Sequence, residues 1–176
     1  MKKEIRALLK MRAAAIAMEP EQNLGTSDSF EIIKFILAAE SYGIESAFVR
    51  EVYPLQDFTP LPGVPSFIPG IVNVRGQILP LVDLKKFFNL PEKGLGELNK
   101  VIILHDERME FGILADAVNG TKVIYKEEVL PVPPTVTGIG EEYLKGVTKE
   151  SLIVLNAEKL LSDKNIVVND FVTQNK

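Results

Sequence analysis

The amino-acid sequence predicts an all-β protein that folds as two small packed β-barrels with short capping helices and a helical extension at the N-terminus. Three observations favour this class. From Phe30 onward, short apolar runs rich in β-branched residues are separated by turn residues about every ten positions. Only one segment, Lys2 to Met18, carries a long helical pattern. A weak internal duplication divides the β region into halves too small to bury a full core alone, so we expect them to share one.

The N-terminal helix is predicted to be modestly amphipathic and basic. Ile5, Leu8, Leu9 and Ile16 lie near one face, and Pro20 stops the helix before a polar joint. Such a helix can touch a membrane, a partner or a second copy of the chain. Because its apolar face is small, we expect docking on its own domain or homo-oligomerisation, and no direct membrane insertion. Five of the 20 basic side chains fall in the first twelve positions, namely Lys2, Lys3, Arg6, Lys10 and Arg12.

The pattern divides the chain into a helical extension and joint over 1–29, a β domain of two subdomains over 30–165, and a tail over 166–176. Asn119-Gly120 has the composition of a hairpin turn. The predicted strands are the apolar runs Phe30 to Ala38, Ala47 to Val52, Gly70 to Val74, Gln77 to Val82, Val101 to His105, Glu110 to Ala115, Lys122 to Tyr125 and Leu152 to Leu155.

The duplication is carried by two recurring features. The triplet Tyr42-Gly43-Ile44 recurs as Phe111-Gly112-Ile113, each time after an apolar strand and a polar turn. Further along each half, a strand runs into Asp83 or Asn156 and then into a short helix. Asp and Asn are favoured N-cap residues, so both helices are predicted to be capped.

Composition excludes several functions. A net charge of −4 without a later cluster of basic residues argues against a nucleic-acid surface. The chain has no cysteine, which rules out disulfides, thiol nucleophiles and thiolate metal sites and fits the cytoplasm. No apolar stretch approaches the roughly twenty residues that span a bilayer.

Catalytic patterns are missing as well, so we expect no enzyme, no cofactor and no metal site. His105 is the single histidine, and it ends an apolar strand instead of joining a nucleophile and an acid. Gly138-Ile139-Gly140 lacks the third glycine of a dinucleotide-binding loop. The acidic pairs Glu127-Glu128 and Glu141-Glu142 are typical of solvated surfaces.

The most informative segment runs from Gly70 to Leu84. Two β-branched runs flank Arg75-Gly76, which predicts a hairpin with the arginine at its tip. Asp83 follows the second strand, where it can cap a helix over Leu84 to Phe88.

This segment matches the pattern G-x-x-N-x-R-G-x-[IV]-x-P-[LIV]-[VI]-D-L and resembles the hallmark of the CheW family. Members of that family are scaffolds that couple chemoreceptors to the histidine kinase CheA. The resemblance covers roughly Phe30 to Asp163 and implies two five-stranded SH3-like barrels. It also implies two partners, the cytoplasmic tip of a methyl-accepting chemoreceptor and the regulatory domain of a CheA-type kinase.

The resemblance implies that Arg75 lies in a receptor-facing groove, with Glu51 as an acidic residue on the same face. Val49 and Ile78 can form the apolar centre of that groove, or can belong to the core. Gly70 is implied to mark the edge where the kinase docks. The ordinary alternatives are an exposed hairpin arginine, an exposed strand carboxylate, and a glycine that only permits a turn after Pro69.

Two other functions stay open from the sequence. An enzyme with a carboxylate-only site between the barrels would need converging carboxylates in that cleft. A scaffold of the same fold in a chemotaxis-like pathway controlling pili or development would use the same groove as a motility scaffold.

Overall fold

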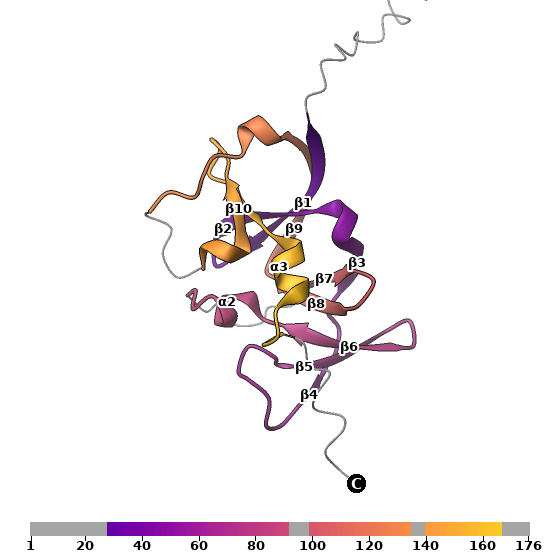
Figure 1. Ribbon diagram of the computed structural model, residues 1–176. Coiled ribbons are helices and arrows are strands. Elements are labelled where there is room, and N and C mark those ends of the chain that lie inside the picture. The colour runs from indigo at the N-terminus through magenta and orange to yellow at the C-terminus, as the bar shows by residue number, and fades with distance from the viewer. Residues whose placement is uncertain (1–27, 92–98, 135–139, 167–176) are drawn as a thin grey trace, which may run out of the picture.

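The computed structural model describes residues 28–91, 99–134 and 140–166. Within them the chain is mostly strand, in two sheets with a few short helices (Figure 1). The strands are β1 (Ser29–Leu37), β2 (Glu40–Glu45), β3 (Val49–Pro54), β4 (Thr59–Pro60), β5 (Gly70–Val74), β6 (Gln77–Val82), β7 (Lys100–His105), β8 (Glu110–Ala115), β9 (Ala117–Tyr125), β10 (Leu144–Val147) and β11 (Ile153–Leu155). The helices are α2 (Leu84–Phe87) and α3 (Ala157–Ser162), with 3-10 turns η1 (Ser46–Phe48), η2 (Lys126–Glu128) and η3 (Glu141–Tyr143). The predicted all-β class is confirmed in this coarse sense.

The first sheet has five strands in the order β10, β11, β2, β1, β9. β1 and β2 form a hairpin in which Phe35 lies opposite Tyr42, and their rings stack with centroids 6.0 Å apart. β11 runs parallel to β2, while β9 runs antiparallel to β1 as an outer strand. Gly43 of β2 leaves room for the side chain of Ile32 on β1, because a Cβ at Gly43 would lie 2.6 Å from Ile32 Cδ1.

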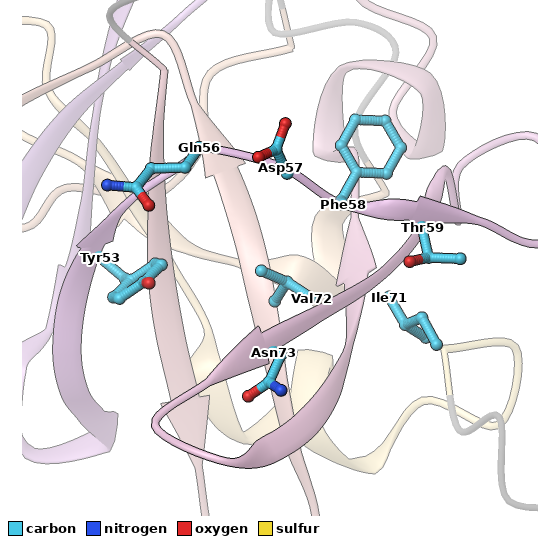
Figure 2. Close-up of a pocket in the computed structure, with 8 residues that line it drawn as sticks. All are labelled: Tyr53, Gln56, Asp57, Phe58, Thr59, Ile71, Val72 and Asn73. Carbon is cyan, nitrogen blue, oxygen red and sulfur yellow. The ribbon is translucent and has the colours of Figure 1, made fainter.

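The second sheet has six strands in the order β3, β7, β8, β6, β5, β4. β7 and β8 form a hairpin, and β6 runs parallel to β8. The two-residue strand β4 pairs with β5, where Thr59 lies opposite Ile71 (Figure 2). Gly112 has the same role here as Gly43 in the first sheet, since a Cβ would lie 2.4 Å from Val101 Cγ1.

The predicted duplication is confirmed, and the two halves exchange strands. Each half begins with a hairpin, β1–β2 or β7–β8. The strands that follow β2 pair with the hairpin of the second half: β3 with β7, and β6 with β8. The strands that follow β8 pair with the hairpin of the first half: β9 with β1, and β11 with β2. Neither half can therefore form a complete sheet from its own strands.

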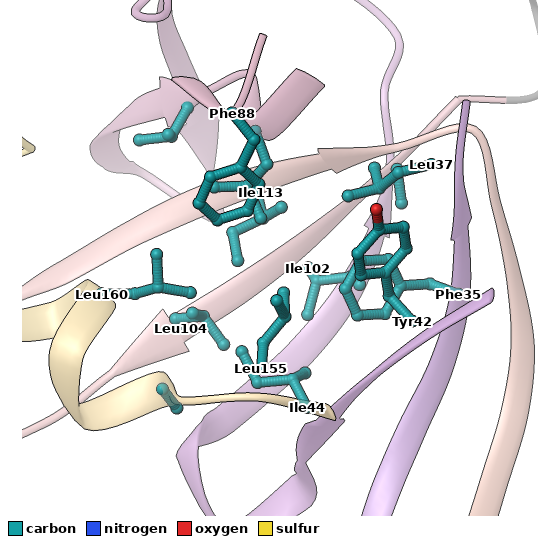
Figure 3. Packing of buried hydrophobic residues seen from close by; sticks show 14 of the residues in the cluster. Phe35, Leu37, Tyr42, Ile44, Phe88, Ile102, Leu104, Ile113, Leu155 and Leu160 are labelled. Carbon is teal, nitrogen blue, oxygen red and sulfur yellow. The ribbon is translucent and has the colours of Figure 1, made fainter. Parts of the chain in front are cut away.

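One apolar cluster joins the two sheets, as predicted for a shared core. It contains Phe35 and Tyr42 from the first sheet and Leu104 and Ile113 from the second, each of them fully buried (Figure 3). Leu160 of α3 closes the same cluster. Two smaller clusters lie within single sheets, one in the second sheet and one in the first. Because the largest cluster draws on both sheets, we expect the sheets to unfold together.

Both helix caps are present. Asp83 Oδ1 accepts hydrogen bonds from the backbone amides of Lys85 at 2.9 Å and Lys86 at 3.4 Å. Asn156 Oδ1 accepts one from Lys159 N at 3.2 Å.

Removing either cap is expected to cost modest stability. Asp83→Ala and Asn156→Ala should each lower the free energy of unfolding by about 1 kcal/mol, because the first amides of α2 or α3 lose their acceptor. Chemical denaturation followed by circular dichroism measures this. Each variant should still unfold in one transition, and two separated transitions would contradict the shared core.

The prediction of a hairpin turn at Asn119-Gly120 is wrong, because these residues lie inside β9. Ile33 pairs with Thr121 and Phe35 with Val118, so one residue of β1 faces two of β9. Gly120 has φ +85°, and the pair forms a bulge instead of a hairpin. Pairing along β1 outweighs the local turn preference, because it satisfies backbone hydrogen bonds on both sides of the bulge.

The predicted runs also miss three strands, β2, β4 and β10, and start β3 too early, since residues 46–48 form η1. β2 begins with polar Glu40 and Ser41, and β4 and β10 contain Pro60 and Gly146. Their local composition disfavours strand, and only pairing with distant strands makes them extended.

In the described residues, the hydrogen-bonded order of each sheet is open, with β10 and β9 at the ends of one and β3 and β4 at the ends of the other. Closed five-stranded barrels are not observed. The second sheet also carries a sixth strand, β4.

Candidate functional site

The β5–β6 hairpin presents Arg75 at its tip, as predicted. Val74 pairs with Gln77, so Arg75 and Gly76 form a two-residue loop with φ +54° and +87°. Positive φ at both positions is the geometry of a type I′ turn, whose twist suits a hairpin. Asn73 Oδ1 accepts a hydrogen bond from Gly76 N at 2.8 Å, which holds the turn.

The structure brings Arg75 and Glu51 together. Arg75 Nε lies 3.2 Å from Glu51 Oε2, although Glu51 comes from β3 at the far edge of the sheet. The Arg75 side chain is 78% exposed and that of Glu51 23%. An ion pair this exposed contributes under about 1 kcal/mol to stability, so the guanidinium remains available to a partner.

A second arginine supports this pair, and the sequence analysis did not find it. Val49 pairs with Leu104 and Glu51 with Ile103, which leaves Arg50 as the extra residue of a bulge. Arg50 Nη2 lies 3.6 Å from Glu51 Oε1, and Arg50 Nη1 forms an ion pair with Glu110 of β8. Neighbouring Arg50 and Glu51 therefore contribute to one charged network.

Gln77 completes that network from the hairpin. Its Oε1 accepts a hydrogen bond from Arg50 Nη1 at 2.9 Å, and its Nε2 donates to Glu110 Oε2 at 2.5 Å. The five side chains of the network, Arg75, Glu51, Arg50, Gln77 and Glu110, tie the hairpin tip to β3 and β8. No local pattern could have identified Gln77 or Glu110, because they meet Arg50 only through strand pairing.

The two predicted apolar residues differ in exposure. Ile78 is 64% exposed and follows Gln77 on β6. Val49 is half-buried and packs against the shared core. Ile78 can therefore contact a partner directly, whereas Val49 lies at the margin of the core.

Gly70 is buried beside another strand of its own chain. It pairs with Pro60 of β4, and a Cβ at Gly70 would lie 2.1 Å from the carbonyl oxygen of Thr59. The equivalent glycine of the second half, Gly146, lies as close to Leu130, whose carbonyl oxygen would be 2.3 Å from a Cβ. The sequence predicted that a partner sheet approaches closely at Gly70. In the structure the close neighbour is β4 of the same chain, so kinase docking at Gly70 stays a prediction.

A family model described as the CheW-like domain matches residues 31–165. The chain belongs to the CheW family. The hairpin and its network lie inside the matched region.

Individual relatives agree with this membership. The chain is 36% identical over 146 residues to the chemotaxis protein CheW of Treponema pallidum, covering 79% of this chain and 86% of that protein. It is 33% identical over 155 residues to protein FrzA of Myxococcus xanthus, covering 85% and 91%. The crystal structure of the scaffolding protein TtCheW from Thermoanaerobacter tengcongensis superposes with a TM-score of 0.68 at 30% identity, covering 82% of this chain and 96% of that one.

This CheW-family protein also has a pocket of about 300 Å³ between the β3–β4 connection and β5, the first strand of the hairpin (Figure 2). Asp57 is the one carboxylate among the eight residues that line it. Within the described ranges, no group of three or more potential metal ligands occurs, and no helix is long and apolar enough to cross a membrane.

Two tyrosines have clearly raised pKa values, and both serve the fold. Burial, followed by a hydrogen bond to Glu40, raises the pKa of Tyr42. A hydrogen bond to Asp163 raises the pKa of Tyr143, with burial as the second cause. Neither residue belongs to the hairpin network.

Proposed function

We propose that this protein is a non-enzymatic coupling scaffold. It bridges the cytoplasmic tip of a methyl-accepting chemoreceptor and the regulatory domain of a CheA-type histidine kinase, and it acts in the cytoplasm. Membership of the CheW family supports this proposal. The structural similarity to the scaffolding protein TtCheW supports it as well.

The receptor site is proposed to centre on the hairpin tip. Arg75 supplies an exposed guanidinium, Glu51 orients it at 3.2 Å, and Ile78 adds exposed apolar surface on the adjoining strand. Val49 lies at the margin of this surface. A charged rim around an apolar centre is the usual composition of a protein interface.

Arg75→Ala is expected to weaken receptor coupling while leaving the fold intact. The side chain is 78% exposed, so the free energy of unfolding should change by less than about 1 kcal/mol. Co-sedimentation with receptor-containing membranes and kinase measures coupling, and thermal melting measures the fold. Arg108→Ala, at an exposed arginine of the β7–β8 turn, is the matched control. Normal co-sedimentation of Arg75→Ala, or equal loss in the control, would contradict the assignment.

Kinase docking is proposed at the edge formed by β4 and β5 around Gly70. The observation that supports this edge is its exposure: Thr59 and Pro60 are exposed, and the pocket of about 300 Å³ lies beside them. Gly70 is buried at this edge, and its lack of a side chain lets β4 pair closely with β5.

The finer architecture is also a proposal. We expect each sheet to curl into an SH3-like barrel. The segment that follows the outer strand, β3 in the second sheet or β9 in the first, would pair with the strand at the opposite end of that sheet. In the second sheet that segment forms β4, and in the first Leu130 exchanges two 2.9 Å backbone hydrogen bonds with Val147 of β10. The domain boundaries 1–29, 30–165 and 166–176 belong to the same proposal and agree with the family match over 31–165.

A chemotaxis-like pathway controlling pili or development is the second candidate. The similarity to FrzA of Myxococcus xanthus favours keeping it. Both pathways would use the same hairpin, so affinity capture of the kinase and receptor from the native organism decides between them.

A further inference from the structure

Two exposed apolar side chains lie on one edge strand of the first sheet. Of the five large hydrophobic residues exposed within the described ranges, Val123 at 54% and Tyr125 at 44% both belong to β9. Val123 and Tyr125 are two positions apart on β9 and so point to the same side of the sheet. Glu31 of β1 lies opposite Val123 and is also exposed. We call Val123, Tyr125 and Glu31 the outer-strand patch.

The patch borders a strand edge. β9 ends the order of the first sheet, and its stretch from Thr121 to Tyr125 is rich in residues that favour strands. Farther along β9, the edge is protected by the Asn119-Gly120 bulge and by Lys122, which pairs with Glu150. Natural proteins protect strand edges with such features or cover them. The exposed apolar residues Val123 and Tyr125 lie beyond the bulge, so this end of the edge calls for a cover.

The chain itself enters the fold at this patch. Ser29 pairs with Tyr125, and Lys126 N donates a hydrogen bond to Asp28 O at 2.9 Å. The Lys126 ammonium lies 2.7 Å from Asp28 Oδ2. Residues 1–27 are thus tethered beside the patch, which raises their effective concentration there to roughly the millimolar range.

Charge complements this placement. The adjoining segments 28–31 and 125–128 hold four carboxylates and one ammonium, from Asp28, Glu31, Glu127, Glu128 and Lys126. The first twelve residues hold five basic side chains and one acidic one. The opposite signs favour contact between them.

We propose that the segment Lys2 to Met18 docks as an amphipathic helix on the outer-strand patch of its own chain. The apolar face with Leu8 and Leu9 covers Val123 and Tyr125, and the basic side chains face the surrounding carboxylates. Residues 19–27 are the tether, which can extend to about 30 Å and so reaches the patch easily. Docking hides the β9 edge from a second copy.

A neighbouring groove is a poorer site for this segment. It has a volume of about 460 Å³ and lies between Phe30, Val129 and Glu45. Lys126 and Lys145 also line it, so it presents two ammonium groups for one carboxylate. A basic helix is therefore better matched by the outer-strand patch.

A spin label tests the proposal directly, because the chain contains no cysteine. Ala14→Cys places a nitroxide opposite the predicted apolar face in the full-length protein. We expect loss of amide NMR signal intensity at Thr121 to Tyr125 and not in β5. About 0.5 M salt should weaken the loss, since it shortens the Debye length to roughly 4 Å.

Two controls make the result decisive. Val123→Ser combined with Tyr125→Ser should restore the β9 signals, whereas Ile78→Ser, at an exposed apolar residue of the other sheet, should not. Mixing spin-labelled protein with separate isotope-labelled protein detects contact between copies. Broadening of β9 only in that mixture, or none at β9 in the single-protein sample, would overturn docking within one chain.

Discussion

Asp116→Ala is expected to lower the free energy of unfolding by about 3 kcal/mol, because the carboxylate accepts charge-assisted hydrogen bonds from Lys85 Nζ and from Ala38 N. Lys85 Nζ lies 2.7 Å from Asp116 Oδ1, and the Lys85 side chain is only 3% exposed. The substitution removes this carboxylate from a largely buried site, where a charge-assisted hydrogen bond is stronger than in water.

Asp116 also joins the two sheets. Its Oδ2 accepts a hydrogen bond from Ala38 N at 2.9 Å in the β1–β2 turn, while its Oδ1 contacts Lys85 at the start of α2, which follows β6. Its backbone N donates to Ile36 O at 2.9 Å. Loss of the side chain should therefore loosen the contact between both halves at once, and unfolding should remain a single transition.

Asp28→Ala is the matched control for this prediction. Lys126 and Asp28 also lie 2.7 Å apart, but their side chains are 66% and 75% exposed. We expect a change below about 1 kcal/mol there, because water screens the pair. Urea denaturation of both variants measures the difference. Equal destabilisation would show that burial does not determine the strength of these pairs.

Gly70→Ala is expected to destabilise the protein by roughly 3 kcal/mol or more, because the close contact involves backbone that no rotamer change can relieve. A Cβ would lie 2.1 Å from Thr59 O, so β4 would have to leave β5. Gly146→Ala should behave similarly, since its Cβ would lie 2.3 Å from Leu130 O.

Gly76→Ala is the control that separates a steric clash with neighbouring backbone from the strain of a left-handed backbone conformation. Gly76 has φ +87°, and a Cβ there would meet nothing within 4 Å. The expected cost is only about 1–2 kcal/mol, from the left-handed backbone alone. Thermal melting compares the three variants, and equal losses for Gly70→Ala and Gly76→Ala would rule out the contact with Thr59 as the cause.

The same contact changes how kinase docking can be tested. Any side chain at Gly70 disturbs β4, so lost binding would not distinguish an interface from misfolding. Thr59→Lys alters an exposed side chain at this edge without filling the close contact. Calorimetric titration of that folded variant against the kinase regulatory domain is the sharper experiment.

Much of this protein could be predicted from the sequence because it depends on neighbours along the chain. The Arg75-Gly76 hairpin follows from turn chemistry between two β-branched runs, and the Asp83 and Asn156 caps follow from residue type before a short helix. The recurring aromatic-Gly-Ile triplet revealed the duplication. The shared surface of Arg75 and Glu51 was implied by the family resemblance and not by neighbours along the chain, and the two side chains lie 3.2 Å apart. The family resemblance was recognised from the same local hallmark, and the family model that matches residues 31–165 confirms it.

Only the tertiary structure decided the features that join distant positions. The exchange of strands between halves, the support of Glu51 by Arg50 and Gln77, and the bond from Ala38 to Asp116, 78 positions away, depend on which strands pair. Asn119-Gly120 shows the reason most clearly: its local preference is for a turn, but pairing with β1 makes it a bulge. Local propensities amount to about 1 kcal/mol per residue, whereas strand pairing and burial act over many residues together, so the long-range terms win wherever the two disagree.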